Sequence, residues 1–188
     1  MRPVPLFTFF LAITLFQSPF ANAQGNQHKH EPGAKVGRVT FKVSCTTEAQ
    51  SHFNLAVAWL HSFEYEEAEK AFTEVATMDP ACGMAHWGVA MSNYHQLWAP
   101  PSQDEMSRGV AGATKAKAVG AKTQRERDYI AAIDVFYRDA DKLDHRTRLF
   151  AYHEAMKRLY QQYPDDREAG VFYALTLIST GMASNDKT

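Results

Sequence analysis

The feature that most constrains this chain is a helical apolar pattern that runs, with short interruptions, from Thr46 almost to the end. Apolar residues recur at spacings of three and four, and the interruptions carry Pro, Gly or Asp, which end helices. No alternation of strand length follows residue 43. We therefore predict an all-α fold with helices at 47–61, 65–78, 83–98, 103–119, 124–138, 145–162 and 166–180.

Capping residues support several of these helix boundaries. A capping box pairs a Ser or Thr with a Glu or Gln three residues later, at the first turn of a helix. Asp144 is the predicted N-cap of the sixth helix, and Gly181 is expected to end the last one. The capping spacing occurs in Thr47 with Gln50, Ser102 with Glu105, Thr123 with Glu126 and, more weakly, Asp165 with Glu168.

The first 23 residues have the pattern of a secretory signal peptide. Arg2 supplies a positive charge, and an apolar run follows from Leu6 to Phe16. Ala21 and Ala23 are the small residues that signal peptidase accepts before its cut. We therefore expect export to a periplasm or secretion. The apolar run is too short to span a bilayer, and we expect no transmembrane segment later in the chain.

The remaining chain divides into an arm and a helical domain. Residues 24–38 are polar and without period, and 39–43 alternate as a short extended segment would. We assign 24–45 to this arm and extended segment, and 46–188 to the helical domain. The formal net charge is −1, which gives no electrostatic reason to expect a nucleic-acid partner.

Residues 49 to 82 form a first unit of 34 residues. A second unit begins at Gly83, a degenerate third spans 133–164, and a fourth begins with the helix that contains Ala174. In the first unit, His52 and Val75 depart from the pattern that its other residues follow. That pattern rests on Leu55, Ala56, Trp59, Tyr65, Ala68, Phe72 and Pro80.

On these residues the chain resembles the tetratricopeptide repeat (TPR) family over about 140 residues. The stretches HFNLAVAWLHSFEYEEA and DPACGMAHWGVAMS are also similar to a group of exported bacterial TPR proteins, which are usually longer than this chain. The resemblance implies a right-handed solenoid of about three antiparallel helix pairs plus one unpaired helix. It also implies that the sequence is the N-terminal part of a longer family member.

The family uses its concave groove to bind a peptide or protein segment, so the resemblance implies a non-catalytic binding scaffold. His61 and His95 occupy the same position in successive units, and the resemblance directs that position into the groove. We expect no cofactor and find no catalytic motif, which leaves the question of an enzyme open but less favoured. The predicted groove residues are Phe53, Val57, Leu60, His61, Trp87, Met91, Tyr94 and His95.

Two further features are open to more than one interpretation. His61, His95 and Met91 together could hold copper or another late metal, but no chelating spacing such as H-E-x-x-H supports this, and groove-lining histidines without metal are favoured. Cys45 and Cys82 come at helix ends that are neighbours in a stacked solenoid, and an oxidising compartment favours a disulfide between them. The alternative is two free thiols.

The last predicted helix, 166–180, has apolar residues around most of its circumference. In a repeat they would be covered by a following helix, and only residues 182–188 remain after Gly181. We therefore expect self-association through 166–180, or a continuing chain that covers the helix. The alternatives are that this helix folds back on the third unit or that it frays. The residues concerned are Val171, Phe172, Leu175, Leu177 and Ile178.

The signal-peptide interpretation predicts that the exported protein begins at Gln24. N-terminal sequencing or intact-mass measurement of the secreted or periplasmic protein tests this. An exported protein that still carries Met1 would contradict the prediction.

Overall fold

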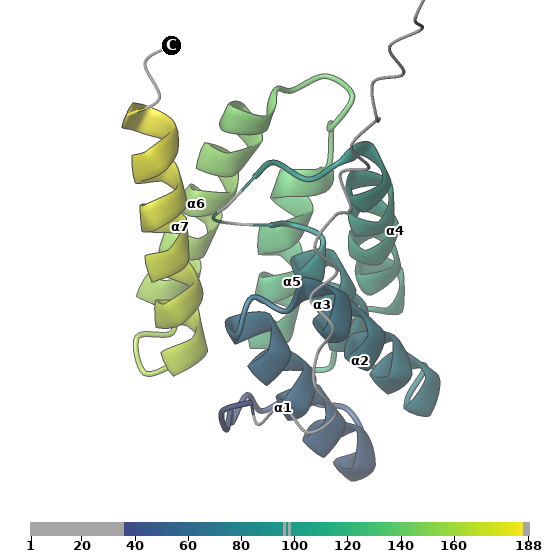
Figure 1. Ribbon diagram of the computed structural model, residues 1–188. Coiled ribbons are helices and arrows are strands. Elements are labelled where there is room, and N and C mark those ends of the chain that lie inside the picture. Colours follow the sequence, from purple (N-terminus) through teal and green to yellow (C-terminus); the bar gives the residue numbers. More distant parts are fainter. Residues whose placement is uncertain (1–35, 96, 98, 186–188) are drawn as a thin grey trace, which may run out of the picture. The chain divides into compact units, whose positions relative to one another are not determined.

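A computed structural model describes residues 36–95, 97 and 99–185. The predicted signal peptide and most of the polar arm lie outside the described residues. The described chain is all-helical, with seven helices and no strand (Figure 1). None of these helices combines the length and apolarity needed to cross a membrane. The helices are α1 (Thr47–His61), α2 (Tyr65–Met78), α3 (Gly83–Ser92), α4 (Gln103–Val119), α5 (Gln124–Tyr137), α6 (His145–Gln162) and α7 (Arg167–Asn185).

The capping residues fix most helix starts as the sequence predicts. Ser102 and Thr123 form complete capping boxes with the glutamates three residues later, and the Asp144 carboxylate accepts from the Thr147 backbone N–H. Two predicted caps are wrong by one residue. Thr46 caps α1 instead of Thr47, and Asp166 accepts from the Glu168 N–H at the start of α7, instead of Asp165.

Two predicted helix ends also differ. Helix α3 stops at Ser92, because the Asn93 side chain donates to the Val89 carbonyl and His95 has a left-handed φ of 47°. Helix α7 continues through Gly181, which an isolated glycine in a helix permits at a cost of about 1 kcal/mol. The predicted stop at Gly181 is therefore wrong.

The helices pack in chain order, each against the next, from α1 to α7. In addition, α1 contacts α3 and α3 contacts α5, so these three odd-numbered helices lie side by side. Helix α7 does not continue that row: its backbone stays close to α6 and not to α5 (Figure 1).

The core is centred on Trp87 in α3. Its indole contacts five other aromatic rings at centroid distances of 5.5 to 6.3 Å. These rings come from four helices and from the extended segment 39–43, which packs into the helical domain instead of lying apart from it. The five rings belong to Phe41, Phe53 in α1, Phe72 in α2, Tyr129 in α5 and Phe172 in α7.

Gly88 in α3 allows α2 to approach. A Cβ added to Gly88 would lie 2.1 Å from Phe72 Cδ1, well inside van der Waals contact. The ring of Phe72 is fully buried and occupies the space that a larger residue at position 88 would need. The contact between Phe72 and Gly88 therefore fixes the distance between α2 and α3.

We predict that Gly88→Ala lowers the free energy of unfolding by about 1–3 kcal/mol, because the methyl group overpacks the Phe72 site. Phe72→Ala should cost about 3–5 kcal/mol, because it leaves a cavity. Denaturant titration monitored by circular dichroism measures both. Gly181→Ala is the control, since an added Cβ there meets nothing within 4 Å. Equal losses in Gly88→Ala and Gly181→Ala would contradict the packing described here.

Candidate functional site

Six of the eight predicted groove residues lie in the core, so the predicted groove is not open to a partner. Phe53, Val57, Leu60, Trp87, Met91 and Tyr94 are each at most 1% exposed. Side chains from α6 and α7 cover them. Phe172 packs against Trp87, and the Tyr152 ring packs against Tyr94 while its hydroxyl donates to Met91 Sδ.

The two remaining groove residues, His61 and His95, are half-buried and lie in separate surroundings. His61 Nε2 lies 2.7 Å from Glu168 Oε2 at the start of α7. His95 stacks on Tyr65 and lies 3.3 Å from Glu105 in α4. Burial lowers the pKa of His95, and the nearby Glu105 only partly offsets this effect.

The suggested metal set of His61, His95 and Met91 is not supported by this arrangement. Each histidine is paired with a different glutamate, and the Met91 sulfur accepts a hydrogen bond from Tyr152. Among the described residues, the one cluster of His, Cys, Asp and Glu with ligand spacing joins Asp79 to Cys45 and Cys82. Its two sulfur atoms are bonded to each other.

The Cys45–Cys82 disulfide, the pairing favoured by the sequence, ties the extended segment to the start of α3. Backbone hydrogen bonds hold the same segment elsewhere. Phe41 N donates to Asn54 Oδ1, and both the backbone N–H and the hydroxyl of Ser44 donate to the Glu126 carboxylate. Residues 41–46, which comprise the end of the extended segment and the residues after it, are therefore held firmly against the helices and form a wall of the structure.

Beside this wall lies a cavity of about 870 Å³, which is the best candidate site in the described part of the chain. Its walls are the extended segment, the Arg125 side chain, the end of α6 and the start of α7. The lining residues are Arg38, Val39, Thr40, Lys42, Arg125, Gln162, Tyr163, Pro164, Asp165, Asp166, Arg167 and Glu168.

Arg125 organises the inner side of the cavity. Its Nε donates to Asp166 at 2.6 Å, its Nη1 donates to the Lys42 carbonyl at 2.8 Å, and its guanidinium lies over the Phe41 ring. Tyr129 also donates to Asp166. Burial acts to raise the pKa of Asp166, but hydrogen bonds from Arg125 and Tyr129 hold it below its usual value, so Asp166 stays ionised.

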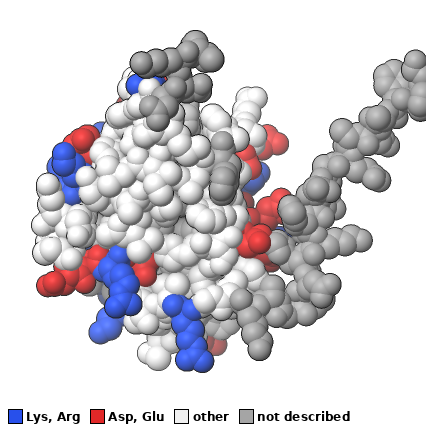
Figure 2. Space-filling model, turned by 60° about the vertical axis from the view of Figure 1, so that its left-hand side comes forward, with Lys and Arg blue, Asp and Glu red and all other residues white. Residues whose placement is uncertain are grey.

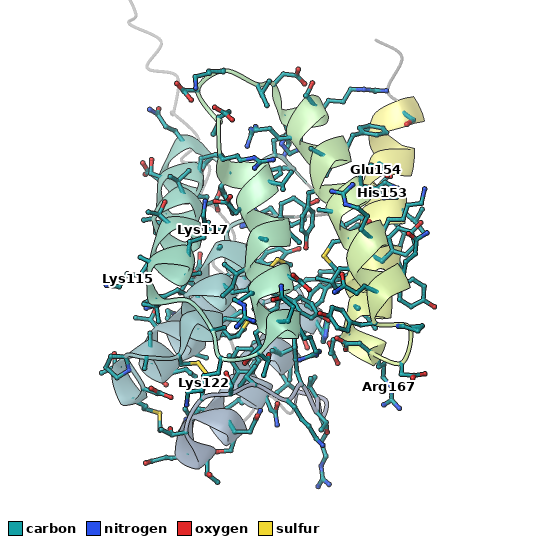
Figure 3. The ribbon with its side chains drawn as sticks, turned by 180° about the vertical axis from the view of Figure 1, so that it is seen from behind. Lys115, Lys117, Lys122, His153, Glu154 and Arg167 are labelled. Atoms are coloured by element: carbon teal, nitrogen blue, oxygen red, sulfur yellow. A yellow bond between two sulfur atoms is a disulfide. The ribbon has the colours of Figure 1, made fainter. Side chains whose placement is uncertain are left out.

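The outer side of the cavity carries an excess of positive charge. Arg38, Lys42 and Arg167 are exposed, and none of them forms an ion pair with a described residue. Figure 3 shows Arg167 at the outer edge of the start of α7. Of the three acidic residues of the lining, Asp166 is neutralised by Arg125 and Glu168 lies against His61, so the three exposed cations outnumber the remaining carboxylates. The site is suited to an anionic group.

The sequence analysis did not find this site, because its residues come from three distant segments. Arg38 was assigned to the polar arm and Arg125 to the first turn of a helix, so nothing local connected them. The signal that could have been noticed is the basic character of residues 35–42 (KVGRVTFK), which lacks an acidic residue. Only the three-dimensional structure shows that this stretch lies beside the start of α7.

Glu126 supports the cavity wall, and its environment predicts a pH dependence of stability. Burial acts to raise the pKa of Glu126, but hydrogen bonds from Ser44 and Thr123 hold it below its usual value. A carboxylate with a lowered pKa stabilises the fold above about pH 4.3, and this contribution is lost as pH falls through the folded-state value.

We therefore predict that Glu126→Gln lowers the free energy of unfolding at pH 7 by about 1–3 kcal/mol and weakens its dependence on pH between about 5 and 2. Denaturant titrations at a series of pH values test this. The exposed Glu48→Gln is the control and should change stability by less than about 0.5 kcal/mol. Unchanged stability of Glu126→Gln at pH 7 would contradict the prediction.

Comparisons with protein-family models, with curated proteins and with solved structures each found no match. The relation to the TPR family therefore stays a prediction from the repeat residues. A function for this chain has to be argued from the residues and contacts described above.

Proposed function

We propose that this protein is a non-catalytic binding module whose cavity beside the start of α7 holds an acidic segment of a peptide or protein partner. The carrying observation is the charge of that cavity. Arg38, Lys42 and Arg167 surround it without ion pairs to described residues, while Asp166 and Glu168 are already paired. An acidic segment would neutralise these cations. Their positive field would also attract the segment and so raise its rate of association with this protein.

The rigidity of the walls supports binding without chemistry. Phe41 and the Arg125–Asp166 pair hold two walls in place, so little conformational entropy is lost when a ligand docks. Two of the lining carboxylates are already engaged: Asp166 accepts from Arg125 and Tyr129, and Glu168 lies against His61. The proposal accordingly assigns the site to recognition.

We extend the proposal to the architecture and location of the protein. The side-by-side arrangement of α1, α3 and α5 and the Ala68, Phe72 and Gly88 packing are compatible with TPR-like units in a solenoid. The signal-peptide pattern and the disulfide favour a periplasmic or secreted protein. On this proposal the chain is an exported protein with a TPR-like architecture.

The binding proposal predicts that replacing Arg38, Lys42 and Arg167 together by Ala weakens binding of an acidic peptide about 10- to 100-fold, because three exposed charge contacts are lost. A fluorescently labelled peptide with five consecutive glutamates serves as the probe, and its anisotropy reports the affinity. Binding should also weaken as salt is raised, since the contacts are solvent-exposed.

A control variant replaces three other lysines, Lys115 and Lys117 of α4 and Lys122 in the loop after it, all of which lie away from Arg167 (Figure 3). This variant removes the same net charge and should retain the affinity of the parent protein. If both triple variants lose affinity equally, the attraction reflects net charge alone. That result, or equal binding of a five-lysine peptide, would contradict the proposed site.

A further inference from the structure

Helix α7 is apolar on both its inner and its outer side. On the inner side, Phe172 and Ala169 are fully buried next to three polar residues. Thr176, Ser179 and Thr180 are at most 6% exposed. On the opposite side, Ile178 is 52% and Met182 is 51% exposed. The outer side of a surface helix in a globular protein is normally polar, so the apolar outer side of α7 has the character of an interface.

The three buried polar residues of α7 form most of their hydrogen bonds within the helix itself. The hydroxyls of Ser179 and Thr180 donate to the Thr176 carbonyl within the same helix, and Thr176 donates to Tyr173 O. Thr176 Oγ1 lies 3.0 Å from His153 Nδ1 of α6, which links this polar group to another helix. The exposed apolar residues of α7 are available for a contact outside the described chain; they include Val171, Leu177, Ile178 and Met182.

The outer side has the spacing of a helix-pairing seam. Val171, Leu175, Ile178 and Met182 follow one another at intervals of four, three and four residues, which keeps them on one face. Ala174 and Gly181 lie on the same face and are exposed. A Cβ at Gly181 would meet nothing within 4 Å, so a second helix can approach closely there.

The charge of this face selects the partner. From Ala169 to Asn185 the helix contains no charged residue. Figure 2, in which the side of the molecule that carries α7 is turned forward, shows a broad area without charged side chains. The matching surface must therefore be apolar and uncharged, and the same face of another copy meets both requirements without like-charge repulsion.

We propose that α7 pairs in an antiparallel manner with the α7 of a second copy of this chain. A two-fold axis perpendicular to the helix generates this arrangement, and it places Leu175 of each copy opposite Ile178 of the other. The antiparallel arrangement also aligns opposite ends of the helix dipoles. A helix of 19 residues offers a seam about 28 Å long. The area buried by one such helix pair is smaller than that of a stable dimer interface, so we expect weak association that depends on protein concentration.

Sedimentation equilibrium on the full chain at about 5–200 µM tests the proposal, a range suited to micromolar association. The average mass should rise toward twice the monomer mass. Ile178→Glu should stay monomeric, while its circular dichroism and melting temperature match those of the parent. Val110→Glu, a charge placed at another exposed apolar residue, should associate like the parent.

The geometry has its own test. Leu175→Lys should also be monomeric alone, and a mixture of Leu175→Lys with Ile178→Glu should form a heterodimer, because antiparallel pairing sets the lysine opposite the glutamate. A parent protein that stays monomeric at every concentration would assign the face to a different partner and overturn the proposal. An Ile178→Glu variant that still dimerises would overturn it as well.

Discussion

The contact on which the rest of the structure depends is the aromatic cluster around the Trp87 indole. Five rings meet it, and they come from positions between 41 and 172 of the chain. No single helix pair could bury its apolar face alone, and this cluster joins α1, α2, α5 and α7 to α3. Aromatic side chains suit this role, because each buries a large apolar area and edge-to-face contacts add specific geometry.

The candidate site inherits its shape from that cluster. Phe41 is buried in the cluster and carries the extended segment with it, so Arg38 and Lys42 are held at the rim of the cavity. Tyr129 belongs to the same cluster and donates to Asp166, which in turn orients Arg125. The core and the candidate site therefore share residues at two points.

Local chemistry explains what could be predicted from the sequence, and long-range packing explains what could not. The capping boxes at Ser102 and Thr123 act within four residues, so those helix starts were predictable. The burial of the predicted groove residues could not be predicted, because it depends on where α7 lies. The repeat pattern placed α7 next in the row, whereas Phe172 brings it over Trp87, and the cationic cavity exists only through that path.

The hydrogen bonds of Ser44 with Glu126 have a consequence for the order in which the molecule matures. The two residues are 82 positions apart, and the Arg125 contact with Lys42 spans 83. A chain that emerges from its N-terminus can pack α1 on α2 long before it can seat the extended segment, because distant contacts carry the larger loop-closure cost. The cavity beside the start of α7 is thus completed only after these distant segments have met, and a half-emerged chain does not yet contain it.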